Sequence, residues 1–137
     1  FKGSTRADSS IELEAQYAAL LGVPARFVIN EYGMTEMLSQ FYDAKLVATG
    51  RHHIKAGPPW VRTAVVHPET LALLPDGEAG LLRHFDLANV FSVCAIQTED
   101  VGRRVGDGFE LHGRAPGAAP RGCSIAMDTF LNAVANG

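Results

Sequence analysis

A polar segment at residues 30–36, Asn-Glu-Tyr-Gly-Met-Thr-Glu, combines residue types that suit nucleotide binding. Tyr32 offers a ring for stacking on a base, and Gly33 lets the backbone approach a ligand closely. Thr35 offers a hydroxyl and an N–H to phosphate oxygens, and Glu36 is a hard oxygen ligand suited to magnesium. The alternative is an ordinary turn with a surface threonine and a surface glutamate, and the residue types alone leave both interpretations open.

The chain has two cysteines, which are too few for a disulfide framework. Cys94 lies in the apolar run 93–96, so we expect it in the core. Cys123 lies in a polar segment fourteen residues from the end of the chain. A thiolate is a nucleophile, and Arg121 two positions away would lower the pKa of Cys123. The alternative is a structural Cys123 that packs a terminal strand.

Composition excludes several classes of function. With 137 residues and 47% hydrophobic side chains, the chain can form one ordinary domain or two small lobes. The formal net charge is −3 and the charges are mixed along the chain, so nucleic acid is not an expected partner. No apolar run approaches the roughly 18 residues that span a bilayer, and no signal-peptide layout is present, which predicts a cytoplasmic protein without membrane association. The five histidines have no spacing typical of a metal pair.

The elements around the 30–36 segment are predicted from local patterns. An apolar face predicts a helix at residues 11–21, which Ser9 or Ser10 would cap and Gly22 would end. The run 27–29 predicts a short buried strand, which would place the 30–36 segment at a strand's carboxyl end, where open α/β sheets bind ligands.

The middle of the chain is predicted to be rich in strands, and the fold class is therefore mixed α+β. We expect a helix and strand layer, then a β-rich lobe, then a short tail. The lobe's predicted strands lie at residues 45–49, 61–67, 71–74, 80–85, 91–97 and 109–112, with turns at 75–77 and 106–108. Residues 115–120 form a predicted connector, and a final helix is expected to begin near Asp128.

The run Tyr-Gly-Met-Thr-Glu at 32–36 resembles the nucleotide motif of the adenylate-forming superfamily, which includes acyl-CoA synthetases, adenylation domains of peptide synthetases and luciferases. Asp100 resembles that superfamily's aspartate, which bonds both ribose hydroxyls, and Arg114 resembles the arginine of its Gly-Arg hinge. The Gly-Glu-Ala-Gly at 77–80 also resembles its hairpin upstream of the aspartate. A carboxylate can accept from two vicinal hydroxyls, and an arginine holds ribose or phosphate oxygens without losing its charge.

Within the superfamily the chain is most similar to the acyl-protein synthetases, over nearly its whole length. The similarity lies in residues 30–42, 86–89, 113–114 and 121–124. In that family a cysteine close to the C-terminus takes the acyl group as a thioester, so the resemblance implies this role for Cys123. It also implies two parts: residues 1–113 as the end of the large domain with its β-rich subdomain, and 114–137 as a hinge and short tail.

The resemblance implies an ATP-dependent acid–thiol ligase that uses Mg²⁺, forms an acyl-adenylate from a fatty acid and serves an acyl reductase partner. Thr35 and Glu36 would meet phosphate and magnesium, and Tyr32, Gly33, Asp100 and Arg114 would hold the nucleotide. The superfamily's catalytic lysine has no counterpart, since the lysines are Lys2, Lys45 and Lys55, and we expect a fragment that is inactive alone. The alternatives are an acyl-CoA ligase of the phenylacetate type, in which Cys123 has no catalytic role, and a non-catalytic docking module.

Overall fold

The computed structural model of the chain describes residues 10–46 and 53–118. Described residues up to Ala25 belong to one compact unit, and Arg26–Pro116 form a second. The last strand of the second unit ends at Arg114. The predicted boundary between residues 113 and 114 stays a prediction.

The first described element is helix α1, Ser10–Leu21, which confirms the predicted helix to within one residue. Gly22 follows it with a φ of 66°, the left-handed conformation that commonly ends a helix and that glycine adopts without steric cost. No described helix is long and apolar enough to cross a membrane.

The predicted strand at residues 27–29 is wrong. The chain instead forms a 3-10 turn, η1, at Ala25–Phe27, directly after Pro24. Phe27 stays half exposed, and the Arg26 guanidinium lies 4.5 Å from its ring centre. No strand among the described residues pairs with this run, so the strand propensity of its β-branched and aromatic residues is not expressed. The first strand, β1, is Glu31–Tyr32, which lies inside the 30–36 segment rather than before it.

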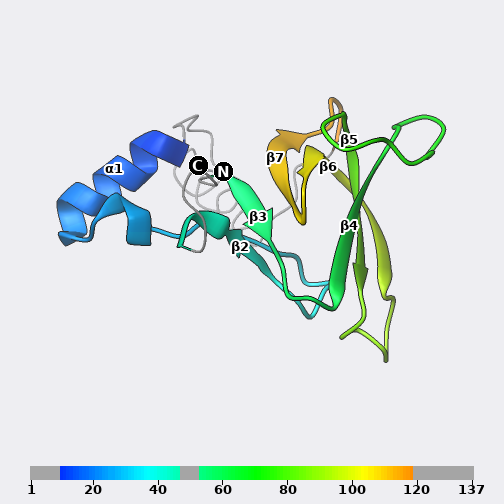
Figure 1. Cartoon of the computed structure of the whole chain (residues 1–137), viewed down its shortest axis with the longest axis horizontal. Coiled ribbons are helices and arrows are strands. Elements are labelled where there is room, and N and C mark those ends of the chain that lie inside the picture. The colour runs from blue at the N-terminus through cyan, green and yellow to red at the C-terminus, as the bar shows by residue number, and fades with distance from the viewer. Residues whose placement is uncertain (1–9, 47–52, 119–137) are drawn as a thin grey trace, which may run out of the picture. The chain divides into compact units, whose positions relative to one another are not determined.

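Arg26–Pro116 contains one seven-stranded sheet in which every pairing is antiparallel (Figure 1). The strand order is β1-β2-β3-β7-β6-β5-β4. The strands after β1 are β2 (Phe41–Asp43), β3 (Ile54–Ala56), β4 (Val61–Val66), β5 (Ala79–Asp86), β6 (Ala95–Val105) and β7 (Gly108–Arg114), with a second 3-10 turn, η2, at Ala44–Leu46. The mixed α+β class is confirmed.

Several strand predictions agree with these bounds. The strands predicted at 61–67, 80–85 and 109–112 correspond to β4, β5 and β7, and the turn at 106–108 joins β6 to β7. The run 71–74 forms only an isolated bridge, between Val66 and Leu73. In place of a strand at 45–49 the structure has η2, and residues 47–52 lie outside the described ranges. The predicted helix near Asp128 also lies outside them.

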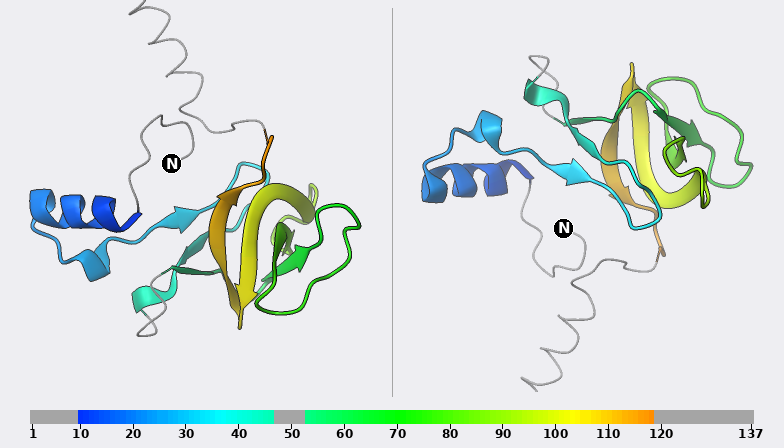
Figure 2. Two further views of the ribbon diagram at one scale, coloured as in Figure 1. Left: turned by 90° about the horizontal axis from the view of Figure 1, so that it is seen from above. Right: turned by 90° about the horizontal axis from the view of Figure 1, so that it is seen from below.

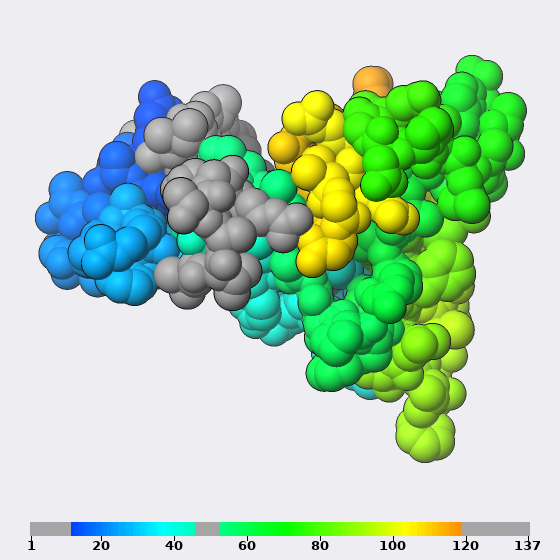
Figure 3. All heavy atoms as spheres, viewed as in Figure 1, coloured from blue at the N-terminus to red at the C-terminus, as the bar shows by residue number. Residues whose placement is uncertain are grey.

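The strand predicted at 91–97 begins only at Ala95, because the connection between β5 and β6 turns first. Asn89 stabilises that turn, as its side chain donates to the Val93 carbonyl at 3.1 Å. Figure 3 shows the yellow-green atoms of this connection projecting from the sheet. Phe91 is fully exposed at 102%, and Cys94 is exposed rather than in the core, which corrects the prediction for that cysteine. Turn formation by polar side chains here outweighs the strand propensity of the apolar run.

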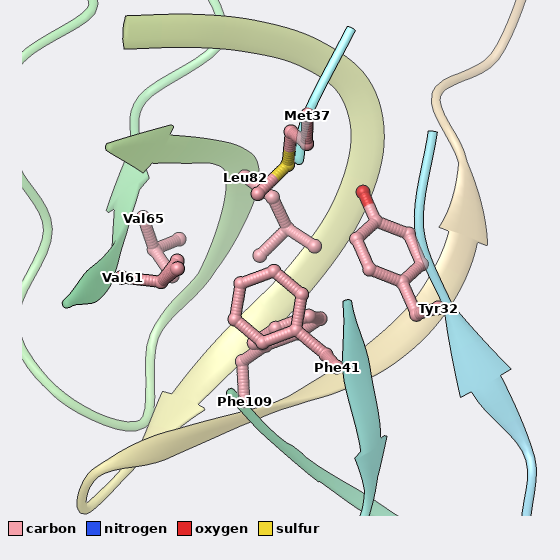
Figure 4. Close-up of a cluster of buried hydrophobic side chains, with 7 residues drawn as sticks. All are labelled: Tyr32, Met37, Phe41, Val61, Val65, Leu82 and Phe109. Atoms are coloured by element: carbon pink, nitrogen blue, oxygen red, sulfur yellow. The ribbon is translucent and has the colours of Figure 1, made fainter. Parts of the chain in front are cut away.

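The core lies where the sheet curls. Figure 2 shows β6 strongly curved, and its pairings with β5 and β7 each contain a register shift. Such irregularities bend a strand and increase its twist. The curl brings β1 and β5, which are not adjacent in the sheet, around one cluster of buried side chains (Figure 4): Tyr32, Met37, Phe41, Val61, Val65, Leu82 and Phe109.

Candidate functional site

The Tyr-Gly-Met-Thr-Glu segment forms the end of β1 and a tight turn. The Met37 N–H donates to the Met34 carbonyl at 3.1 Å, which closes the turn. Thr35 and Glu36 occupy its two central positions, and both are exposed. The Thr35 hydroxyl donates to the Glu36 carboxylate at 3.2 Å, and Gly33 before them is half-buried. The turn therefore presents a hydroxyl and a carboxylate together to solvent.

Asp86 at the end of β5 fixes the chain just after this turn. Its carboxylate accepts the N–H groups of Leu38 and Ser39 at 3.0 and 2.8 Å, and the Ser39 hydroxyl at 2.9 Å. A fourth bond comes from the Ala88 N–H at 3.0 Å. Desolvation by burial raises the pKa of Asp86, but the bonds from Ser39, Ala88 and Leu38 together hold it below its ordinary value.

Asn89 holds the turn itself, because its side-chain amide donates to the Glu36 carbonyl at 2.8 Å. Asp86 and Asn89 belong to the 86–89 segment that carried the resemblance, but sequence reasoning assigned them no role. A polar Asp-x-x-Asn run between two apolar stretches is typical of a turn, and that signal was available.

The hairpin of β6 and β7 brings Asp100 and Arg114 directly opposite each other, as cross-strand partners. Arg114 Nη1 donates to Asp100 Oδ1 at 3.3 Å, and Nη2 donates to the Glu99 carboxylate at 2.6 Å. The spacing of fourteen residues in the sequence thus becomes one contact in space. Asp100 is buried, while the Arg114 side chain lies on its outer side with 24% of its surface exposed.

Tyr32 reaches the same carboxylate from the first strand. Its hydroxyl donates to Asp100 Oδ2 at 2.8 Å. Desolvation by burial raises the Tyr32 pKa, and the neighbouring Asp100 carboxylate raises it further, so the hydroxyl keeps its proton. The Tyr32 ring itself is buried, and Phe109 lies edge-on to it at 5.4 Å between ring centres. Figure 4 shows Tyr32 on β1 among the buried side chains of the cluster. The structure therefore joins Tyr32, Asp100 and Arg114, three of the predicted nucleotide residues.

His84 on β5 lies behind Tyr32 and is fully buried, a placement that sequence reasoning anticipated only as a histidine satisfied within the lobe. Its Nε2 lies 3.3 Å from the Tyr32 hydroxyl, and its Nδ1 lies 3.0 Å from the Thr63 hydroxyl. Desolvation by burial lowers the pKa of His84 to about 4, although the nearby Asp100 opposes the shift. The imidazole is therefore neutral at neutral pH.

A buried ion pair fixes the start of the 30–36 segment. Lys55 Nζ donates to Asp43 Oδ1 at 2.6 Å and to the Asn30 carbonyl at 2.9 Å. The Asn30 N–H donates to Asp43 Oδ2 at 2.9 Å. The ammonium also bonds the Asn30 side chain, so its three donors all have acceptors. Lys55 is thus occupied in holding the segment, and no sequence signal indicated this pairing.

The exposed Glu36 carboxylate and Thr35 hydroxyl are hard oxygen donors and fit a magnesium ion that also binds phosphate. Magnesium commonly keeps several waters and takes one or two protein carboxylates together with substrate phosphates. Among the described residues no group of three or more His, Cys, Asp or Glu side chains is placed to hold a metal ion. Cys123, the predicted acyl acceptor, lies outside the described residues.

The chain has relatives among characterised proteins. It is 30% identical over 92 residues to the long-chain-fatty-acid–luciferin-component ligase of Vibrio harveyi, a match that covers 62% of this chain and 24% of the relative. Its identity to the ligase of the same name from Aliivibrio fischeri is 34% over 90 residues, or 59% of this chain and 23% of the relative. The chain thus spans about a quarter of the length of these relatives. No protein-family model matches it.

Solved structures with a similar fold include MatB and the amide bond synthetase McbA. ATP-bound MatB from Rhodopseudomonas palustris superposes with a TM-score of 0.55 and 20% identity, over 75% of this chain and 23% of MatB. The amide bond synthetase McbA from Marinactinospora thermotolerans gives a TM-score of 0.53 at 18% identity, over 74% of this chain and 24% of McbA. The two ligases confirm the resemblance inferred from the motifs, and the solved structures show that the fold is shared.

Proposed function

We propose that this chain is the C-terminal portion of an ATP-dependent acyl-activating enzyme, and that its motifs bind the nucleotide. The observation that carries the proposal is the meeting of Tyr32, Asp100 and Arg114 at one buried carboxylate. These residues lie up to 82 positions apart (114 − 32), and each belongs to a motif matched independently in the sequence. The similarity to fatty-acid ligases and to ATP-bound structures supports the same conclusion.

The Asp100 carboxylate would accept both ribose hydroxyls. A carboxylate has about four acceptor sites, two on each oxygen. Tyr32 uses one site on Oδ2, and Arg114 uses one site on Oδ1. One site on each oxygen is left, which suits two vicinal hydroxyls.

A ribose would reach Asp100 when Arg114 moves outward. Arg114 lies 3.3 Å from the Asp100 carboxylate, and its shorter contact, at 2.6 Å, is to Glu99, whose side chain is 48% exposed. Exposed ion pairs contribute at most about 1 kcal/mol, so this contact resists the movement little. Arg114 Nε is buried without a hydrogen-bond partner among the described residues, and that donor would be satisfied by a ligand oxygen. The proposed hinge at residue 114 agrees with such a movement.

The turn at Thr35 and Glu36 would hold the phosphates. The Thr35 hydroxyl would donate to phosphate, and the Glu36 carboxylate would bind the Mg²⁺ that accompanies ATP. When bound, that ion neutralises charge on the phosphate oxygens. Gly33 would give the nucleotide close access to the backbone. Tyr32 would stack on the base. Its ring is buried in the present structure, so stacking requires the ring to become accessible.

The reaction proposed has two steps. The carboxylate oxygen of a fatty acid attacks the α-phosphorus of ATP, a P–O bond forms, and the bond to pyrophosphate breaks. The Cys123 thiolate then attacks the carbonyl of the acyl-adenylate, forming a C–S bond and releasing AMP. The thioester would be passed to an acyl reductase. In the phenylacetate type of ligase, the second nucleophile is instead coenzyme A.

The test is the intact mass of the complete enzyme after incubation with ATP, Mg²⁺ and a panel of fatty acids. We expect an acyl mass on the protein that hydroxylamine removes and that Cys123→Ser abolishes. Cys94→Ser is the matched control, because Cys94 is the exposed thiol of the described residues. Pyrophosphate release without an acyl mass would favour coenzyme A as acceptor. If neither pyrophosphate nor an acyl mass is found, the proposal is contradicted and the alternative of a non-catalytic docking module is favoured.

A further inference from the structure

A line of buried hydrogen bonds ends on the Asp100 carboxylate. It begins at Thr63 on β4, passes through His84 on β5 and Tyr32 on β1, and reaches Asp100 on β6. The successive separations are 3.0, 3.3 and 2.8 Å. His84 and Thr63 lie outside every motif that carried the resemblance, and neither has a part in the proposed reaction.

The hydrogens in this line can be assigned from donor and acceptor capacity. Tyr32 has one hydroxyl hydrogen, which it donates to Asp100. The bond between Tyr32 and His84 is therefore donated by His84 Nε2–H. A neutral imidazole with its hydrogen on Nε2 has an acceptor at Nδ1, so the Thr63 hydroxyl donates to that nitrogen. All three bonds are directed toward the carboxylate.

We propose that His84 is a positioning residue that acts through Tyr32 to hold the Asp100 carboxylate in the orientation that accepts both ribose hydroxyls. The inference rests on the proposed nucleotide function. Tyr32 fixes Oδ2 only while its hydroxyl points at Asp100, and the Nε2–H of His84 excludes the opposite direction. Polarisation along connected hydrogen bonds also strengthens the last bond of the line.

A role in packing alone makes a different prediction. The His84 ring contacts Phe41 and Phe109 at 5.1 and 5.5 Å between ring centres. The variant His84→Phe keeps an aromatic ring there and removes both nitrogens. His84→Gln places an amide N–H at the distance of Nε2, which restores the donor to Tyr32 while losing the ring. If His84 acts only by packing, His84→Phe should preserve its role better than His84→Gln. If His84 positions Tyr32, His84→Gln should preserve that role better.

The decisive measurement compares AMP with 2′,3′-dideoxy-AMP by calorimetric titration of the complete enzyme. Wild type should prefer AMP by on the order of 100-fold, because two hydrogen bonds to a carboxylate are lost with the analogue. His84→Phe should lower this preference about tenfold while the affinity for the analogue stays unchanged. His84→Gln should restore most of the preference. Thermal melting of each variant verifies that it is folded.

The outcomes separate this inference from the function on which it rests. A wild-type enzyme that binds AMP and the analogue equally removes the ribose role of Asp100, and the inference falls with it. If wild type prefers AMP to the analogue and a folded His84→Phe shows the same preference, the role of His84 is contradicted while the nucleotide function stands. The ¹⁵N spectrum of His84 in the 137-residue chain is an independent check. Hydrogen on Nε2 supports the directed line, and hydrogen on Nδ1 contradicts it.

Discussion

Asp86 at the end of β5 and Asp100 within the neighbouring strand β6 are both buried, but their surroundings are very different. Asp86 accepts four hydrogen bonds, three of them from backbone N–H groups, which cannot leave without unfolding the turn. Asp100 is held by the side chains of Tyr32 and Arg114, and side chains can rotate away. A carboxylate saturated by backbone donors stabilises the fold, whereas one held by side chains can exchange partners for a ligand.

The largest effect is expected at Asp86. Asp86→Ala leaves several buried donors without acceptors, at a cost of about 1–3 kcal/mol each when no water replaces the carboxylate. We expect a loss of about 4 kcal/mol in the free energy of unfolding, measured by urea denaturation. Asp76→Ala, at an exposed carboxylate, is the control. A loss below about 1 kcal/mol would place Asp86 among ordinary surface carboxylates.

The second prediction concerns pH and the histidine behind the site. Because the pKa of His84 falls to about 4 on folding, the native state binds fewer protons than the unfolded state below the ordinary pKa of about 6.5. The stabilising contribution is complete above about pH 6.5 and is lost as the pH falls toward 4, with a total of about 3 kcal/mol. The facing titratable groups are Tyr32 on β1, Asp100 on β6 and, beyond it, Arg114 on β7.

The measurement is the free energy of unfolding of wild type and His84→Gln between pH 4 and 8. The variant should lack the part of the slope between pH 4 and 6.5 that His84 supplies in wild type. Identical slopes would mean that folding does not change the pKa of His84, which would contradict a desolvated imidazole at this position.

The third prediction tests Asp100 as a ligand residue. Asp100→Asn replaces charged hydrogen bonds by neutral ones and leaves an amide N–H facing Tyr32 or Arg114. We expect the affinity for AMP to fall about 100-fold, with the fold retained. Asp76→Asn is the matched control, because it makes the same change at an exposed carboxylate. Unchanged affinity for AMP would mean that Asp100, like Asp86, does not bind the nucleotide.

The smallest effect is expected on the exposed face of the same hairpin. Arg103 and Glu110 are cross-strand partners joined by an ion pair of 2.7 Å, with exposed fractions of 46% and 27% for their side chains. Glu110→Gln should lower the free energy of unfolding by less than about 1 kcal/mol, since water screens the pair. Nucleotide affinity should not change. An effect on AMP binding comparable with that of Asp100→Asn would show that the site extends over this face.

The sequence was sufficient for the elements whose signals are local. The helix at Ser10–Leu21, the glycine that ends it, and the hairpin turn before β7 follow from residues close in the chain. Cys94 and the run 27–29 were predicted wrongly for one reason. Apolar residues were assigned to buried strands, but burial depends on whether another strand is available, and that is not a local property.

The sequence by itself determined the types and order of the residues that could bind a nucleotide, Tyr32, Thr35, Glu36, Asp100 and Arg114, and their motifs were sufficient for the family resemblance. The tertiary structure alone decided which of them meet. The curl of the sheet brings β1 against β5 and β6, so Tyr32 contacts both His84 and Asp100. Thr35 and Glu36 are exposed on a turn that Asn89 holds from the connection after β5. Register and curvature arise from pairing between strands distant in the chain, and for that reason no local pattern specifies them.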